Sequence, residues 1–155
     1  MDRIDRKLLD LLQEDASRTN AELAETIGLS SSSCLRRIQR LKAAGAIDRV
    51  VAILDPAKAG KGLKAVVTVE LERHGEQPTR QFLDLAAKEQ AVVQAYSVSG
   101  QTDVVLMLRL TDMAEFDALC ERLFNDRSNI ARYYTMFVIR TGKETTAIPV
   151  SVQAG

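Results

Sequence analysis

The most constraining feature of this sequence is a pair of capped helices separated by one glycine, between Thr19 and Gly45. Thr19 is followed three residues later by Glu22, which is the capping-box spacing at the start of a helix. Gly28 then fits the left-handed position that ends this helix, and Ser30 is a good N-cap for the next one. A short helix, a glycine turn and a longer helix in succession indicate a helix-turn-helix motif.

A further helix is expected ahead of this motif. Asp2 suits its N-cap, and four apolar residues follow at helical spacing: Ile4, Leu8, Leu11 and Leu12. The longer helix of the motif also has an apolar side, given about 100° of rotation per residue. The residues expected to be buried on that side are Cys34, Leu35, Ile38 and Leu41. The first 46 residues are therefore predicted to form three helices.

The opposite side of the longer helix is small and basic. Residues 30–44 contain no acidic residue, and serines occupy the first turn. Small hydroxyl residues let a helix N-terminus approach a phosphate or a base edge, and arginines reach guanine edges or phosphates. The alternative is a surface helix with a solvated basic face, which is the usual role of a charge run. We predict DNA contacts by Ser31, Ser32, Ser33, Arg36, Arg37, Arg40 and, in the segment that follows, Arg49.

The segment after this helix is expected to form a wing. Gly45 ends the helix, and the apolar residues of 47–54 indicate a short strand or hairpin that stops at Asp55 and Pro56. The small residues "AKAGKG" follow and mark the best domain boundary. The predicted organisation is a winged helix-turn-helix domain at 1–54, a linker at 55–62, a second domain at 63–142 and a C-terminal tail at 143–155.

The second domain alternates between strand and helix patterns. Strand patterns, rich in β-branched residues, lie at 63–71, 92–100, 103–110 and 130–140. Helix patterns cover 76–89 and 112–126, and the second of them opens with Asp112 as its N-cap. The order βαββαβ is that of the split-βαβ, ferredoxin-like fold. The predicted fold class is therefore α+β, with an N-terminal winged helix-turn-helix followed by a ferredoxin-like, ACT-like domain.

The last strand of this domain predicts a dimer. One of its faces holds Tyr133, Thr135, Phe137 and Ile139, and the other holds Tyr134, Met136 and Val138. Both faces are largely apolar, but two helices cover only one side of a four-stranded sheet. In the first strand, Ala65, Val67, Val69 and Leu71 are expected to face those helices. Large apolar sheet faces mark interfaces, so we predict that the same face of a second chain covers the open side.

Composition argues against most other classes of function. Lys+Arg and Asp+Glu both number 21, and zero net charge argues against coating nucleic acid by bulk charge. Cys34 and Cys120 lack metal-like spacing, and His74 lies in a polar segment, so no metal, cofactor or catalytic group is expected. No apolar run approaches the about 18–20 residues of a membrane span, and the charged N-terminus lacks a signal-peptide pattern. We expect a cytoplasmic protein that is not an enzyme.

Four stretches together resemble a known family. They are "IGLSSSSCLRRIQRLKAAGAI", "VSGQTDVVLML", "LTDMAEF" and "TMFVIRTGKE". In this order and at these spacings they resemble the Lrp/AsnC family of bacterial transcription regulators, the leucine-responsive and asparagine ("feast–famine") regulators. The resemblance covers nearly the whole chain. Val104, Ser31 and Tyr133 depart from the family pattern, which often has Tyr, Pro and a smaller polar residue at these places.

The resemblance implies a dimer formed through the βαββαβ domain, often assembled further into an octamer. It also implies an amino-acid effector bound near a Gly-x-x-Asp turn, at a contact between dimers. The positions that match are Gly100, Thr102, Asp103, Met113, Thr135, Met136 and Val138. A carboxylate and backbone N–H groups in such a turn suit the ammonium and the carboxylate of an amino acid. The alternative is that Asp103 only caps its turn, a common role for Asp.

The leading hypothesis is a sequence-specific transcription regulator that binds a pseudo-palindromic site on double-stranded DNA and responds to an amino acid. One alternative is an architectural protein that compacts DNA with little sequence preference, which zero net charge disfavours. Another is an enzyme like the sirohaem decarboxylases, which resemble this family. Those enzymes use histidines beside the tetrapyrrole, and His74 is the only histidine in this chain.

Overall fold

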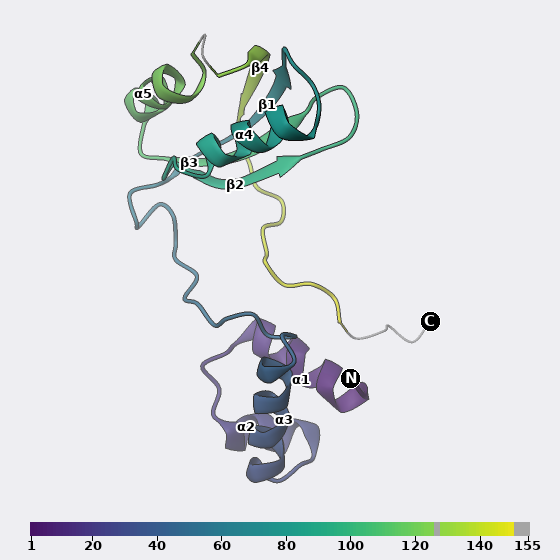
Figure 1. The fold of residues 1–155 in the computed structure, drawn as a ribbon. Helices are drawn as coiled ribbons and strands as arrows, with labels where there is room; N and C mark the ends of the chain where they lie inside the picture. The colour runs from purple at the N-terminus through teal and green to yellow at the C-terminus, as the bar shows by residue number, and fades with distance from the viewer. Residues whose placement is uncertain (126–127, 151–155) are drawn as a thin grey trace. The chain divides into compact units, whose positions relative to one another are not determined.

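The computed structural model describes residues 1–125 and 128–150, and the chain divides into two compact units (Figure 1). One unit contains Met1–Ala52 together with the chain from Gly142 onward. The other unit is Ile53–Thr141. Residues 151–155 of the predicted tail lie outside the described residues.

The first unit is the predicted three-helix arrangement. Its helices are α1 (Arg3–Glu14), α2 (Asn20–Ile27) and α3 (Ser31–Ala43). The predicted caps are all present: Asp2 on α1, Thr19 with Glu22 on α2, and Ser30 on α3. Gly28 has a φ of 71°, and the Leu29 N–H then donates to the Ala24 carbonyl oxygen at 2.9 Å. This left-handed residue turns the chain from α2 into α3, so the helix-turn-helix is confirmed.

One expectation about this core needs correction. Leu8, Leu23, Cys34, Ile38 and Leu41 are buried together, and Leu9 joins them. Leu35, which was expected among them, is 42% exposed. Cys34, Ile38 and Leu41 stand at i, i+4 and i+7, and Leu35 lies about 100° beyond Cys34 on the helix surface. The sequence prediction therefore assigned Leu35 to the wrong side of α3.

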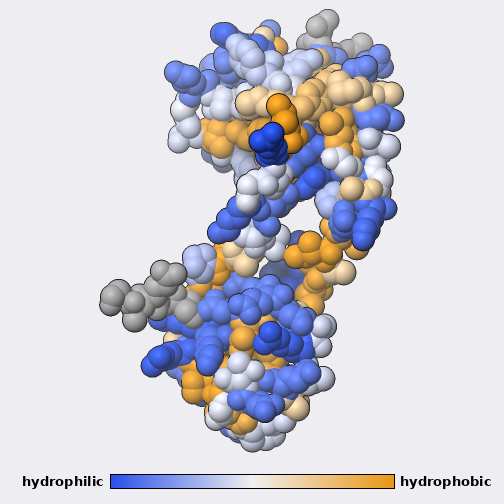
Figure 2. Space-filling model, turned by 180° about the vertical axis from the view of Figure 1, so that it is seen from behind, coloured by the Kyte–Doolittle hydropathy of each residue, from blue (hydrophilic) through white to orange (hydrophobic). Residues whose placement is uncertain are grey.

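The predicted wing is not formed. Residues 48–55, all of which the structure describes, contain no strand. Val50, Val51, Ile53 and Leu54 are each at least 60% exposed, and this segment contributes to the hydrophobic surface of Figure 2. A strand needs a partner to satisfy its backbone groups, and an isolated hairpin is at best marginally stable. The segment offers strand-forming side chains, but it pairs with no other strand.

The second unit has the predicted βαββαβ order. Its elements are β1 (Leu63–Leu71), α4 (Glu76–Ala86), β2 (Val92–Ser97), β3 (Val104–Leu110), α5 (Met113–Leu123) and β4 (Ile130–Phe137). The strands form one sheet in the order β2-β3-β1-β4, and the described neighbours are all antiparallel. This confirms the ferredoxin-like prediction and places β1 in the interior of the sheet.

Both helices of the second unit pack on one face of its sheet. Ala65, Val67, Val69 and Leu71 of β1 are at most 1% exposed, as predicted. They share a core with Phe82 of α4 and with Phe116 and Leu119 of α5. Leu85, three residues after Phe82 on α4, is 44% exposed. Because neither helix covers the other face, Val66, Met107, Tyr134 and Met136 remain on an open side of the sheet.

The tail returns to the helix-turn-helix unit and binds α1. The side-chain amide of Gln13 donates to the Ile148 carbonyl oxygen at 2.9 Å and accepts from the Ile148 N–H at 2.8 Å. The Val150 N–H donates to Asp10 at 3.4 Å, and the Val150 side chain packs against the helical core. The tail therefore adds apolar contact and hydrogen bonds to α1, although its sequence has no helical or strand pattern.

We predict that Gln13→Ala raises the amide hydrogen-exchange rate of α1 by about 5- to 30-fold. Two lost hydrogen bonds of ordinary net strength correspond to about 1–2 kcal/mol of local stability. A chain that ends at Thr146 should show at least this increase, because it also loses the Val150 contacts, and Gln13→Ala should add nothing further in that shortened chain. Independent, additive effects of the two changes would contradict a direct contact between Gln13 and the tail.

Candidate DNA interface and effector site

The start of α3 is arranged to approach an anion. The Ser33 N–H donates to the Ser30 hydroxyl at 3.3 Å, and the Ser30 hydroxyl also donates to the Ser33 hydroxyl at 3.0 Å. Ser31 and Ser32 are exposed, whereas Ser33 is half-buried. The remaining N–H groups of the first turn carry the positive end of the helix dipole. Of the three predicted serines, Ser31 and Ser32 are therefore the accessible ones.

Two of the three arginines on α3 are bound to acidic residues of α1. Arg37 Nη1 donates to Asp2 Oδ2 at 2.7 Å and to Asp5 Oδ1 at 2.8 Å. Arg40 Nη2 donates to both oxygens of Asp5, at 2.8 and 2.6 Å. Asp5 is only 1% exposed, so both guanidinium groups compensate a buried charge. Arg37 and Arg40 thus hold α3 against α1, a role that the sequence analysis did not assign to them.

Asp2 and Asp5 also cap α1 reciprocally. The Asp5 N–H donates to Asp2 Oδ1 at 2.8 Å, and the Asp2 N–H donates to Asp5 Oδ2 at 3.0 Å. The bond from the Asp5 backbone, followed by that from Arg37, lowers the pKa of Asp2 to about 2. Burial raises the pKa of Asp5, but the Asp2 backbone N–H and Arg37 outweigh it, and the pKa is lowered overall. Both carboxylates therefore stay charged far below neutral pH.

Arg36 differs from its two neighbours on α3. Its side chain is exposed, and it forms no ion pair with any residue in the described part of the chain. Arg49, the remaining predicted contact, lies in the extended segment after α3 and pairs with Asp48 at 3.2 Å on the surface. Arg36 is consequently the α3 arginine whose guanidinium forms no ion pair with a described residue, whereas Arg40 is 60% exposed but has its Nη2 bound to Asp5.

The predicted effector turn is attached to the end of β1. The Thr102 hydroxyl donates to the Val69 carbonyl oxygen at 2.8 Å, and the Asp103 N–H donates to the same oxygen at 3.0 Å. Asp103 Oδ2 accepts the Leu71 N–H at 2.8 Å, and Oδ1 lies 3.3 Å from His74 Nδ1. Gly100, with a φ of 124°, allows the tight course of this turn. Asp103 therefore has a structural role within one chain.

The seven predicted effector residues do not come together in one chain. Gly100, Thr102 and Asp103 lie beside Val69 and Leu71, at the end of β1. Thr135, Met136 and Val138 instead lie beside Val67, Val66 and Lys64, in its first half. Lys64 and Val69 are about 17 Å apart at about 3.3 Å per strand residue. An amino acid cannot span that distance, so a single chain does not assemble all seven residues around one ligand.

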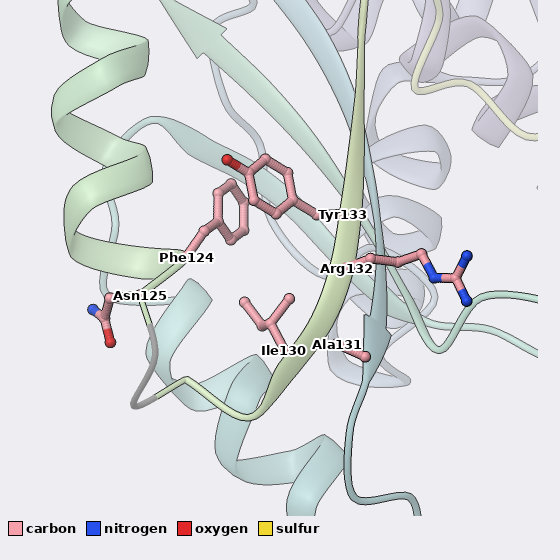
Figure 3. Close-up of a pocket in the computed structure, with 6 residues that line it drawn as sticks. All are labelled: Phe124, Asn125, Ile130, Ala131, Arg132 and Tyr133. Carbon is pink, nitrogen blue, oxygen red and sulfur yellow. The ribbon is translucent and has the colours of Figure 1, made fainter.

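A cavity of about 320 Å³ lies between the end of α5 and the start of β4. It is lined by Phe124, Asn125, Ile130, Ala131, Arg132 and Tyr133. Figure 3 shows the Phe124 and Tyr133 rings side by side, with Arg132 directed to the other side of β4. Their centroids are 4.4 Å apart. Tyr133 therefore contributes a stacked aromatic ring to the wall of this cavity.

His74 and Thr135 are polar residues whose surroundings the sequence did not reveal. His74 was predicted to be a solvated loop residue, and it is mostly exposed, but its ring contacts Asp103. Thr135 faces the helix side of the sheet opposite Val67, and its buried hydroxyl has no hydrogen-bond partner among the described residues. The surroundings of both residues depend on strand pairing across the sheet, which no local sequence signal specifies.

A helix-turn-helix unit followed by a ferredoxin-like domain defines a class of DNA-binding transcription regulator. The family model of the AsnC-type helix-turn-helix domain matches residues 1–42. The model of the Lrp/AsnC ligand binding domain matches residues 64–148. The chain belongs to the Lrp/AsnC family. In the described residues, no helix is long and apolar enough to cross a membrane.

Curated relatives match over almost their full length. The chain is 35% identical over 150 residues to the glutamate uptake regulatory protein of Zymomonas mobilis, spanning 97% of this chain and 91% of that protein. It is 31% identical to the DNA-binding transcriptional activator DecR of Escherichia coli K12, over 97% and 99% of the two chains.

Solved structures agree with this assignment. An AsnC family transcriptional regulator from Agrobacterium tumefaciens has a TM-score of 0.90 at 35% identity, over 96% of this chain and 97% of that chain. A transcriptional regulator from Neisseria meningitidis, solved in complex with L-Met, has a TM-score of 0.89 at 32% identity, over 96% of each chain.

We predict that Asp5→Asn lowers the free energy of unfolding of the helix-turn-helix unit by about 1.5–3 kcal/mol, the range for hydrogen bonds to charged groups. Asparagine keeps the shape and one acceptor but removes the charge that Arg37 and Arg40 share. Asp48→Asn is the matched control, because Asp48 is 84% exposed and pairs only with Arg49 on the surface. Thermal unfolding followed by circular dichroism measures both variants, and equal melting temperatures would contradict the structural role of Asp5.

The carboxylates of Asp2 and Asp5 make the stability of the helix-turn-helix unit depend on pH. A carboxylate whose pKa is lower in the folded state stabilises the fold above its unfolded pKa of about 3.9 and loses that contribution as pH falls. With the pKa of Asp2 at about 2 and that of Asp5 lowered, the unit should lose stability between about pH 4 and pH 2. Asp5→Asn should show a shallower decline over this interval, and an unchanged slope would argue against the lowered pKa of Asp5.

Proposed function

We propose that this protein is a sequence-specific transcription regulator whose DNA binding or assembly responds to an amino acid, and that it acts in the cytoplasm where DNA lies. The observation that carries the DNA-binding part is α3, with its capped N-terminus and exposed Arg36, in a chain of the Lrp/AsnC family. A helix of this kind enters the major groove in helix-turn-helix proteins. Two such helices in a dimer suit a pseudo-palindromic site on double-stranded DNA.

The amino-acid part rests on the turn at Gly100–Asp103 and on the relatives. The Asp103 carboxylate could accept an ammonium group, and it is partly exposed beside His74. The relative from N. meningitidis was solved with L-Met, and a curated relative is named for glutamate uptake. Both names point to the class of amino acids, although they differ in the side chain. We therefore propose an amino acid as the effector and leave its side chain to experiment.

A binding experiment tests this function. Full-length protein selects duplexes from a random library, and the affinity of a selected duplex is then measured with and without each of the twenty amino acids. We predict that at least one amino acid changes the affinity by about 5- to 150-fold, the usual size of allosteric coupling. Equal affinity for selected and random duplexes at several salt concentrations would favour the architectural alternative instead.

Asp103 is the residue to change at the effector turn. Asp103→Asn keeps an acceptor for the Leu71 N–H but removes the charge, so the turn should stay folded while the amino-acid response is lost. Asp103→Ala removes both and should also lower the melting temperature. If Asp103→Asn responds to the amino acid as the wild type does, Asp103 is only a structural residue of its turn.

We also propose that the open side of the sheet is a dimer interface. Tyr96, Tyr134 and Met136 are each at least 50% exposed, and together with Val66 and Met107 they lie on the face without helices. Figure 2, seen from behind, shows hydrophobic surface on this unit. Exposed apolar patches of this extent are rare on monomers. A second copy that presents the same face would remove this surface from water.

Light scattering at micromolar concentration should give about twice the chain mass of 17.1 kDa, or a multiple of that value. The double variant Tyr134→Glu, Met136→Glu should shift the protein toward the monomer. Each of the two chains would otherwise bury its new carboxylates in the interface. Arg80→Glu, on the exposed surface of α4, is the matched control. A 17.1 kDa wild-type species would refute the dimer.

Assembly beyond the dimer would explain the divided effector site. Asp103 and Met136 lie at different ends of β1 in one chain. We propose an octamer in which the Asp103 turn of one dimer meets residues of another dimer. Binding at such a contact would favour one packing of dimers and so change the spacing of the α3 helices along DNA.

A further inference from the structure

Leu35 is exposed at the centre of the free surface of α3. Because residues three and four apart are neighbours on a helix, Leu35 adjoins Ser31, Ser32 and Gln39, and Arg36 follows it directly. All of these residues are exposed. A single exposed leucine is ordinary on a protein surface. Leu35, however, lies on the second helix of a helix-turn-helix, within a face that is otherwise polar, where an apolar side chain has a specific use.

The other charged residues of α3 help to define this face. Arg37 and Arg40 turn toward α1, where Asp5 holds both guanidinium groups. Their donors to Asp5 are not available for a base edge unless the buried carboxylate is left uncompensated. The surface of α3 that remains free of internal bonds is therefore centred on Leu35, Arg36 and Gln39.

Each of these three side chains matches a different base in the major groove. Arginine pairs with guanine O6 and N7, and glutamine pairs with adenine N6 and N7. An apolar side chain contacts the C5-methyl group of thymine. Leu35 and Gln39 are four residues apart, which is about 6 Å along the helix axis, or about two base-pair steps. The three residues can therefore reach about three consecutive base pairs.

We propose that Leu35, Arg36 and Gln39 are the specificity-determining residues of α3, with Leu35 recognising a thymine methyl group, Arg36 a guanine and Gln39 an adenine. This inference rests on the proposed function and assigns its base recognition to particular side chains. Leu35 and Gln39 were not among the DNA contacts predicted from the sequence. Arg37 and Arg40, which were, act here as positioning residues that fix the rotation of α3.

Replacing thymine by deoxyuridine tests Leu35, since that change removes only the methyl group. Each thymine of a duplex selected by the full-length protein is replaced in turn. Within each half-site, replacement of one particular thymine should weaken wild-type binding about 4-fold. That factor corresponds to the free energy of burying one methyl group. Leu35→Ala should bind the thymine and deoxyuridine duplexes equally, and Leu35→Met should restore the difference.

Two further variants test the neighbouring residues. Arg36→Ala should lose its preference for guanine at one position, and Gln39→Ala should become insensitive to 7-deazaadenine at another. Lys42→Ala is the control: Lys42 is exposed near the end of α3, and its loss should weaken all duplexes by a similar factor. None of the four side chains is buried, so each variant should fold as the wild type does. Circular dichroism checks this.

The outcomes separate the two levels of the proposal. A consensus duplex that is insensitive to deoxyuridine at every position overturns the role of Leu35 but leaves the proposed function intact. Equal discrimination between thymine and deoxyuridine by wild type and Leu35→Ala overturns it in the same way. A selection that yields no consensus contradicts the proposed function itself.

Discussion

The orientation of α3 depends on one buried carboxylate. Asp5 on α1 binds Arg37 and Arg40, which follow 32 and 35 residues later in the chain. A buried charge without partners is costly, so the arrangement in which α3 presents these two arginines to α1 is favoured. The rotation of a helix about its axis is a single variable. Fixing it from the inner side also decides that Arg36, which directly precedes Arg37 in the chain, faces solvent together with Leu35.

The second unit depends on a different constraint: its two helices cover only one face of the sheet. Its antiparallel strands alternate their side chains, so β1 buries every second residue under α4 and α5 and presents the others on the open side. Lys64, Val66, Thr68 and Glu70 are consequently half-buried at most. The fold therefore leaves a face of mixed apolar and polar side chains that no described helix of the chain covers.

What the sequence predicted well was local. The caps at Asp2, Thr19, Ser30 and Asp112 depend on residues within four positions, and the alternation of β1 is visible in nine consecutive residues. What it missed was distant. Arg37 and Arg40 bind Asp5, 32 and 35 residues away, and the tail is bound by Gln13, 135 residues before Ile148. The wing was predicted from composition, but a strand forms only when another strand pairs with it.

The effector site shows the same limit in a stronger form. The sequence located the Gly100–Asp103 turn, yet within one chain Asp103 already binds the Leu71 N–H and contacts His74. Of the residues expected to complete the site, Val138 lies beside Lys64, about 17 Å from Val69 along β1 at about 3.3 Å per residue. A turn whose carboxylate is partly engaged and whose partners are out of reach is incomplete as a ligand site. If an amino acid binds there, its affinity must depend on which chains meet, and the linkage between ligand and assembly then works in both directions.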